Sequence, residues 1–192
     1  MGSEQAIVRP DEPVRHQITV EEFLALDTAG FFDDRHVELI DGEIFEMSPL
    51  YLGHGRVSAQ LVLAIGAALD AMSNELEVLL PVSARLDAVS LPEADIIVAK
   101  PAGDDMFVTL ETVRILIEVS ASSLRHDLGR KLRLYARTGV PELWVADVKG
   151  ERIIRFHAPS GEDYAERATF AFGAVVPSAT IPGLVVDTAR LA

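Results

Sequence analysis

The chain has 192 residues, 49% of them hydrophobic, and a formal net charge of −13 at pH 7. This length predicts one domain with one core, and the lack of cysteine excludes disulfides, thiolate metal sites and a cysteine nucleophile. The acidic balance argues against a general nucleic-acid coat protein, because phosphate contacts need lysine and arginine. It leaves a local basic patch open, and solubility is the plainer explanation of the acidic excess.

The first 17 residues are polar and contain proline. We therefore expect residues 1–17 to be a flexible leader and residues 18–192 to form a single domain. The leader lacks the apolar segment of a secretion signal, and no uninterrupted run of 18 apolar residues follows it. The sequence thus predicts a cytoplasmic protein with no membrane association.

The first part of the domain predicts helices, a hairpin and strands. Thr19 and Glu22 have the spacing of a capping box, which predicts a short helix over about residues 20–26. The pair Asp41-Gly42 favours the tight turn of a β-hairpin over residues 37–47. Apolar residues at helical spacing predict an amphipathic helix over about residues 55–72 that packs on a sheet. Further strands are expected at about residues 77–80, 83–88 and 95–99, followed by a loop through 103–105.

A central strand is predicted at residues 115–119, where apolar and mostly β-branched residues indicate that both faces are buried. A helix over about residues 124–137 follows, and Gly139 and Pro141 end it. The remaining strands are expected at about residues 142–148, 152–157 and 164–170. This order of elements predicts an α/β or α+β fold, with a mixed sheet and helices packed on it.

Glu118 interrupts the apolar central strand. An ionised carboxylate there is costly unless it is paired, hydrogen-bonded or bound to a cation. Asp95 begins the preceding strand, and neighbouring strands lie about 4.8 Å apart, so the two carboxylates could share Mg²⁺ or Mn²⁺. In the alternative, Asp95 caps a strand and Glu118 pairs with an arginine.

Asp127, Lys131 and Tyr135 are spaced four residues apart along one edge of the helix that follows. Lys131 lies where the buried and exposed faces meet, so its amine could reach the end of the central strand. A simple Asp127–Lys131 helix pair is the alternative, and such a pair contributes about 0.2–0.5 kcal/mol. Tyr135 and Trp144 are expected in the core.

The remaining candidate site residues are three arginines, a histidine and a glutamate. Arg130, Arg133 and Arg137 form a separate stripe about 120° from Lys131, which is either a solvated face or a phosphate-facing patch. His54 begins a helix and is either a structural hydrogen-bond partner or part of the site. Glu38 alternates with Ile40, which predicts that it points inward.

Taken in order, these segments resemble the Uma-type family of restriction-endonuclease-like proteins in the PD-(D/E)XK nuclease superfamily. The resemblance covers about residues 19–191. It rests on Glu38-Leu39-Ile40-Asp41-Gly42-Glu43, Ser48-Pro49 with His54, Ala94-Asp95, Ile117-Glu118-Val119-Ser120, Asp127-x-x-x-Lys131-x-x-x-Tyr135 and Gly139-Val140-Pro141-Glu142-x-Trp144. Two positions depart from the superfamily pattern: Ala94 replaces the proline of the PD pair, and Ser120 replaces the strand lysine.

The resemblance implies a restriction-endonuclease-like fold and a divalent-metal-dependent endonuclease that hydrolyses phosphodiester bonds in DNA. Asp95, Glu118 and the carbonyl of Val119 would hold Mg²⁺ or Mn²⁺, and Lys131 would replace the strand lysine as the third catalytic residue. Accessory roles would fall to Glu38, His54, Asp127, Tyr135 and Ser120, and contacts with the phosphate chain to Arg130, Arg133 and Arg137. The chain would act as a homodimer.

Two other functions compete with the nuclease. The first is a catalytically weak or inactive homodimer that keeps the nuclease scaffold as a binding module, which the net charge and the missing strand lysine favour. The second is hydrolysis of a small phosphoester.

Overall fold

A computed structural model of the protein describes residues 15–72, 74–100, 103 and 106–192. At its centre is a six-stranded sheet with the order β11-β10-β9-β8-β6-β3. These strands are β3 (Glu77–Leu79), β6 (Ile96–Ala99), β8 (Val113–Ser120), β9 (Glu142–Asp147), β10 (Arg152–Ser160) and β11 (Asp163–Ala171). Strands β8 and β9 are parallel and the other neighbours are antiparallel, which confirms the predicted mixed sheet.

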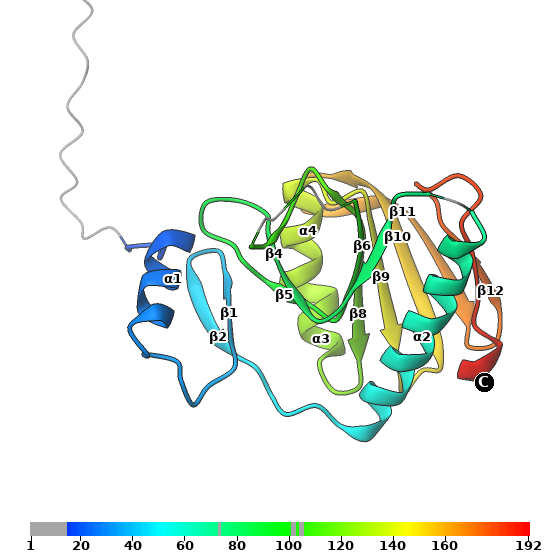
Figure 1. Ribbon diagram of the computed structural model, residues 1–192, viewed down its shortest axis with the longest axis horizontal. Coiled ribbons are helices and arrows are strands. Elements are labelled where there is room, and N and C mark those ends of the chain that lie inside the picture. The colour runs from blue at the N-terminus through cyan, green and yellow to red at the C-terminus, as the bar shows by residue number, and fades with distance from the viewer. Residues whose placement is uncertain (1–14, 73, 101–102, 104–105) are drawn as a thin grey trace, which may run out of the picture.

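Helices cover both faces of this sheet (Figure 1). On one face lie α2 (Leu52–Asp70), the hairpin of β12 (Val175–Pro177) and β13 (Val185–Asp187), and the 3-10 turn η2 (Ala189–Leu191). The other face is covered by α3 (Leu124–His126), the π-helical segment η1 (Asp127–Lys131) and α4 (Leu132–Thr138). Alternate side chains of β8 enter the two cores, as expected for a strand buried on both faces: Ile117 and Val119 pack with α2, and Leu116 packs with α4.

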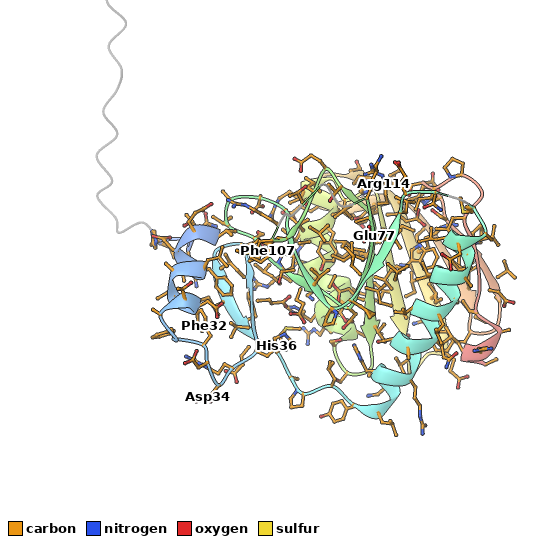
Figure 2. All side chains as sticks on the ribbon, in the orientation of Figure 1. Phe32, Asp34, His36, Glu77, Phe107 and Arg114 are labelled. Atoms are coloured by element: carbon orange, nitrogen blue, oxygen red, sulfur yellow. The ribbon has the colours of Figure 1, made fainter. Side chains whose placement is uncertain are left out.

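The N-terminal helix and hairpin form a small unit beside the main sheet (Figure 1). Helix α1 (Val20–Thr28) starts at the predicted capping box, and β1 (Val37–Ile40) pairs with β2 (Glu43–Glu46) across the predicted turn. Asp41 and Gly42 both have positive φ, at 55° and 73°, as that turn requires. Figure 2 shows Phe32 and His36 on this unit and Phe107 beside it, where Phe107 packs on the unit's own small core.

A second, three-stranded sheet links this unit to the main sheet. It consists of β4 (Val82–Arg85), β5 (Glu93–Ala94) and β7 (Val108–Thr109), in the order β5-β4-β7. The chain leaves this sheet at the end of β5 and enters the main sheet at the start of β6, and the single residue between them is Asp95. Asp95 therefore lies at a break in strand pairing, where its side chain is not committed to either face of a sheet.

Several expected boundaries differ from the structure. The helix expected over residues 124–137 is divided, because its middle is π-helical, although Gly139 ends it in the left-handed conformation as predicted. Helix α2 begins three residues earlier than expected, with Gly53 and Gly55 inside its first turn. The strand expected over residues 83–88 ends at Arg85. Most of the expected leader, residues 1–14, and part of the expected loop, residues 104–105, lie outside the described residues.

The length and apolar character of helix α2 bear on the expectation that the protein does not associate with a membrane. Within the described part of the chain it is the one helix long and apolar enough to cross a membrane, with 19 residues and a mean hydropathy of 1.2. By itself this is weak evidence for a membrane span, since the core helix of a water-soluble protein meets the same criterion. No uninterrupted apolar run marks α2 in the sequence, because glycines and polar residues are scattered along it.

Candidate active site

A cavity of about 360 Å³ opens between the N-terminal hairpin, the first turn of α2, the end of β8 and η1. Its lining includes the three residues predicted to be catalytic, Asp95, Glu118 and Lys131, together with Val119. The N-terminal hairpin adds Glu38, and α2 adds His54. One cavity therefore brings together residues from β1, α2, β8 and η1 and from the break between β5 and β6. Their roles in catalysis remain predictions.

The Asp95 carboxylate is held by two donors. Its Oδ2 accepts a hydrogen bond from the backbone N–H of Val119 at 2.7 Å, and its Oδ1 lies 2.9 Å from Nε2 of the buried His54. Strands β6 and β8 pair Ile96 with Ile117, so one further step of this register places Asp95 beside Glu118. The position of His54 agrees with the hydrogen-bonding role expected for it.

The Glu118 carboxylate is 3% exposed and meets side chains from the helix that follows β8. The hydroxyl of Tyr135 donates to Glu118 Oε1 at 2.5 Å, and Nζ of Lys131 lies 3.3 Å from the same oxygen and 3.4 Å from Oε2. Tyr135 is buried, as expected, but its hydroxyl belongs to the site. Lys131 therefore does reach the end of the central strand, from the π-helical segment.

The ammonium group of Lys131 is surrounded by acceptors. Besides Glu118, its Nζ contacts Glu38 Oε2 at 3.1 Å and the backbone carbonyl of Glu93 at 2.8 Å. An ammonium has three N–H donors, so each of them has a partner here. The contact with Glu118 is the longest of the three, which makes it the weakest of these hydrogen bonds.

Glu38 is buried against Lys131. Besides the lysine, its Oε2 accepts from the backbone N–H of Glu93 at 3.2 Å, and its Oε1 lies 3.5 Å from Nε2 of His126. Burial acts to raise the pKa of Glu38, but the nearby His126 imidazole and the charge of Lys131 outweigh it, and the pKa is lowered. The inward direction predicted for Glu38 is confirmed, and its partner is the lysine.

Protonation differs between the two ends of this network. Burial raises the pKa of Glu118 well above its ordinary value; Lys131 opposes this, while the nearby negative charges of Asp127 and Asp95 add to it. For Lys131, burial acts to lower the pKa, but Glu118, Glu38 and Asp127 outweigh it and raise the pKa. The lysine therefore stays charged at neutral pH, and Glu118 is an acid that lacks enough positive charge nearby.

Ser120, which takes the place of the strand lysine, has a different partner. Oδ2 of Asp127 accepts hydrogen bonds from the hydroxyls of Ser120 and Ser123, both at 2.6 Å. These bonds join the end of β8 to the start of the helix. The ion pairs of Lys131 are with Glu38 and Glu118, so the simple Asp127–Lys131 helix pair considered from the sequence is wrong.

The arginine stripe is largely paired within the chain. Arg130 contacts Glu43 at 3.1 Å and lies over the ring of Phe45, 4.6 Å from its centroid. Arg137 contacts Asp41 at 2.6 Å and Asp87 at 3.4 Å. These two residues therefore contact the N-terminal hairpin while they stay more than a third exposed. Contact of the stripe with a phosphate chain stays a prediction. The third arginine, Arg133, is exposed and has no ion pair within the described residues.

Sequence reasoning missed several residues of the cavity. His126 contacts Glu38, and the carboxylate of Glu93 lies 2.9 Å from Nε2 of His36. One signal was available, since His36 is two residues before Glu38 and therefore lies on the same face of an extended segment. No pattern in the sequence indicates that the backbone of Glu93 binds Lys131, because that contact depends on the break in pairing at Asp95.

The fold and the site together define a class of protein. Restriction-endonuclease-like proteins have this arrangement: a mixed sheet with helices on both faces, and two carboxylates and a lysine beside one cavity. The family model Uma2, described as "Putative restriction endonuclease", matches residues 20–189. The chain therefore belongs to the Uma2 family.

A solved structure supports the same fold. The crystal structure of a putative nuclease belonging to DUF820 from Anabaena variabilis is similar to this chain with a TM-score of 0.69. The match covers 91% of this chain and 97% of that chain at 17% sequence identity. At this identity the likeness shows the fold alone. No functionally curated protein matches the sequence.

Proposed function

We propose that this protein is a nuclease that requires a divalent cation and hydrolyses phosphodiester bonds in DNA. The observation that carries the proposal is the convergence of Asp95, Glu118 and Lys131 on one cavity. Membership of a family described as restriction endonucleases supports the reaction class.

The carboxylates of the cavity are suited to a Mg²⁺ or Mn²⁺ ion that takes its other ligands from water and substrate. They are not suited to an ion held by protein side chains alone. Among the residues that the structure describes, no three acidic or histidine side chains are grouped closely enough to form a ligand set by themselves. Mg²⁺ is commonly held by one or two carboxylates and completes its shell with water and substrate phosphate. Asp95, Glu118 and the carbonyl of Val119 would hold the ion, and the raised pKa of Glu118 indicates an acid that a nearby cation would stabilise in its ionised form.

When bound, such an ion lowers the pKa of a water molecule and polarises the phosphate. The residues of the chain orient this chemistry. Lys131 remains charged, so it cannot accept a proton; it donates hydrogen bonds and stabilises negative charge. Its weakest bond is to Glu118, and this N–H is the one that would turn to a water or a phosphate oxygen if Glu118 held the cation. His54 and the N–H of Val119 fix the orientation of Asp95.

Cleavage of DNA in the presence of Mg²⁺ or Mn²⁺ tests this proposal. We expect Glu118→Gln to lower the cleavage rate by at least about a hundredfold, because electrostatic stabilisation of the transition state is lost. Glu166→Gln, which changes an exposed glutamate of β11, is the matched control and should cleave like the wild type. Cleavage that persists unchanged in Glu118→Gln would show that the activity comes from a contaminant.

A binding module without catalysis is the second candidate. The observation in its favour is that every N–H of Lys131 already has a partner within the chain. Calorimetric titration with Mn²⁺ separates the two functions: tight binding that Asp95→Asn abolishes would argue against an inert scaffold. Turnover of a model phosphate ester with no cleavage of DNA would instead support a small-molecule phosphoesterase.

A further inference from the structure

Helix α2 leaves a regular stripe of residues uncovered. Its buried side holds Val57, Leu61, Ile65 and Leu69, together with His54. The opposite side exposes Arg56, Ala59, Leu63, Ala67 and Asp70, which are spaced three or four residues apart and so lie in one line along the helix. Leu63, at the middle of the line, is 58% exposed. Leu63 and the two alanines form an apolar centre between a basic and an acidic end of the line.

The residues of the stripe are arranged symmetrically about Leu63, with small residues next to it and two residues of opposite charge at the ends. Ala59 and Ala67 are each four residues from Leu63, and Arg56 and Asp70 are each seven residues from it. Neither Arg56 nor Asp70 takes part in an ion pair within the described residues. When a two-fold axis passes through Leu63, a residue on one side of it meets the partner's residue from the other side. A surface with this pattern is therefore complementary to itself.

We propose that α2 packs antiparallel against α2 of a second copy of this chain, with the two helices crossing at Leu63. At about 1.5 Å per residue, Arg56 and Asp70 lie about 10 Å on either side of the crossing point. At the crossing angle of about 20° that is common in helix bundles, they stay close to the partner helix, so Arg56 of each copy meets the partner's Asp70. The alanines let the two backbones approach closely.

The surface beside α2 extends this interface. A groove of about 580 Å³ runs between α2 and the C-terminal segment, and Leu63, Ala67, Val185, Asp187 and Arg190 are among the residues that line it. Val185 is 49% exposed. The exposed apolar side chains of this groove continue the apolar surface of the helix. Asp187 and Arg190 again give one surface both signs of charge.

The inference rests on the expectation of a homodimer and is independent of nuclease activity. His54 belongs to the opposite, buried side of α2, so the proposed contact leaves the active-site cavity of each copy open. Failure of cleavage would therefore not affect it, and a monomeric protein would not affect the proposed chemistry.

A charge exchange measured by sedimentation equilibrium tests the contact. Arg56→Asp and Asp70→Arg each turn two attractive pairs into two repulsive ones, and we expect each single variant to raise the dimer Kd roughly tenfold. The double variant Arg56→Asp/Asp70→Arg restores opposite charges and should restore the wild-type Kd. Arg133→Asp, on the other side of the sheet, is the matched control with no effect. A monomeric wild type, or a dimer that all these variants leave unchanged, would overturn the proposal.

A cross-link tests the crossing point. The chain contains no cysteine, so Leu63→Cys introduces a single thiol that lies opposite itself at the two-fold axis. We expect mild oxidation to give a covalent dimer for Leu63→Cys and none for Leu80→Cys, which replaces a comparably exposed leucine. A monomer that binds lipid vesicles through α2, with no cross-link at Leu63, would instead assign this face to a membrane and overturn the inference.

Discussion

Two buried glutamates on neighbouring strands of the sheet show what separates a structural acid from a functional one. Glu142, in β9, is fully buried and is surrounded by donors. They are Nε1 of Trp144 at 2.6 Å, the hydroxyls of Ser178 and Thr180, both at 2.7 Å, and the backbone N–H groups of Ala179 and Thr180. This carboxylate fixes the segment before β13 to the sheet.

Glu118, in β8, is also buried, at 3% exposed, but has fewer donors. Tyr135 and Lys131 are its hydrogen-bond donors, and Lys131 is shared with Glu38. Glu118 also borders a cavity, whereas Glu142 lies against protein. Burial of a charge therefore does not identify a site. A buried carboxylate with few donors that borders an open cavity does, because a ligand can reach it there.

The largest effect on stability is expected at Lys131. Lys131→Met leaves Glu38 and Glu118 buried without a cation, so the free energy of unfolding should fall by about 3–5 kcal/mol. Urea unfolding at neutral pH measures this loss. Lys100→Met, which removes an exposed lysine paired with Glu75, should cost less than about 1 kcal/mol. A similar small loss at both lysines would show that the site does not depend on the charge of Lys131.

Glu142→Gln sharpens the comparison by removing the structural acid. The amide presents donors to the N–H groups that now bind the carboxylate, so we expect the free energy of unfolding to fall by about 2–3 kcal/mol. Binding of Mn²⁺, measured by calorimetry, should be unchanged. We expect Glu118→Gln to weaken Mn²⁺ binding; an equal loss in Glu142→Gln would show that the division between the two acids is wrong.

The Glu118→Gln variant is expected to differ from the wild type in its pH dependence. Because the folded pKa of Glu118 is raised above 4.5, the folded protein keeps a proton that the unfolded chain releases as the pH rises. The wild type should therefore lose stability progressively relative to Glu118→Gln as the pH rises from about 4.5 toward the raised pKa. Thermal unfolding across this range provides the measurement, and a wild type that gained stability relative to the variant would contradict the assignment.

The smallest effect is expected for the exposed ion pairs of the N-terminal hairpin. Arg137 is 39% exposed beside Asp41 and Asp87. Screening by solvent limits the contribution of such contacts, so Arg137→Ala should cost less than about 1 kcal/mol, and the cost should fall further in high salt. Arg133→Ala, with no ion pair among the described residues, should change nothing. A loss comparable with that of Lys131→Met would mean that the hairpin depends on Arg137 for its position.

The sequence predicts the fold well where local patterns determine the structure. The capping box at Thr19, the turn at Asp41-Gly42 and the doubly buried strand around Glu118 all depend on neighbouring residues, and each is confirmed. The family resemblance correctly indicated Lys131 as a residue of the cavity. The strand at residues 142–147 is likewise predicted from neighbouring residues. No local pattern identifies the set of donors that surrounds Glu142.

Contacts between distant segments could not be predicted in this way. The pairing of Arg130 and Arg137 with the hairpin depends on how the N-terminal unit packs on the sheet, and helical spacing contains no information about it. The same applies to the binding of Lys131 by the backbone of Glu93. Hydrophobic periodicity also could not distinguish a continuous α-helix from one that contains a π-helical turn.

That wide turn over Asp127–Lys131 has a consequence for comparing sequences within the family. A π-helical turn accommodates one more residue than an α-helical turn, so it changes the angular position of every side chain that follows by about 100°. The distance in residues from Ser120 to the lysine therefore does not by itself locate the ammonium group in the cavity. In relatives with one residue fewer in this segment, a different position is expected to hold the cation, and an alignment that preserves residue count would overlook it.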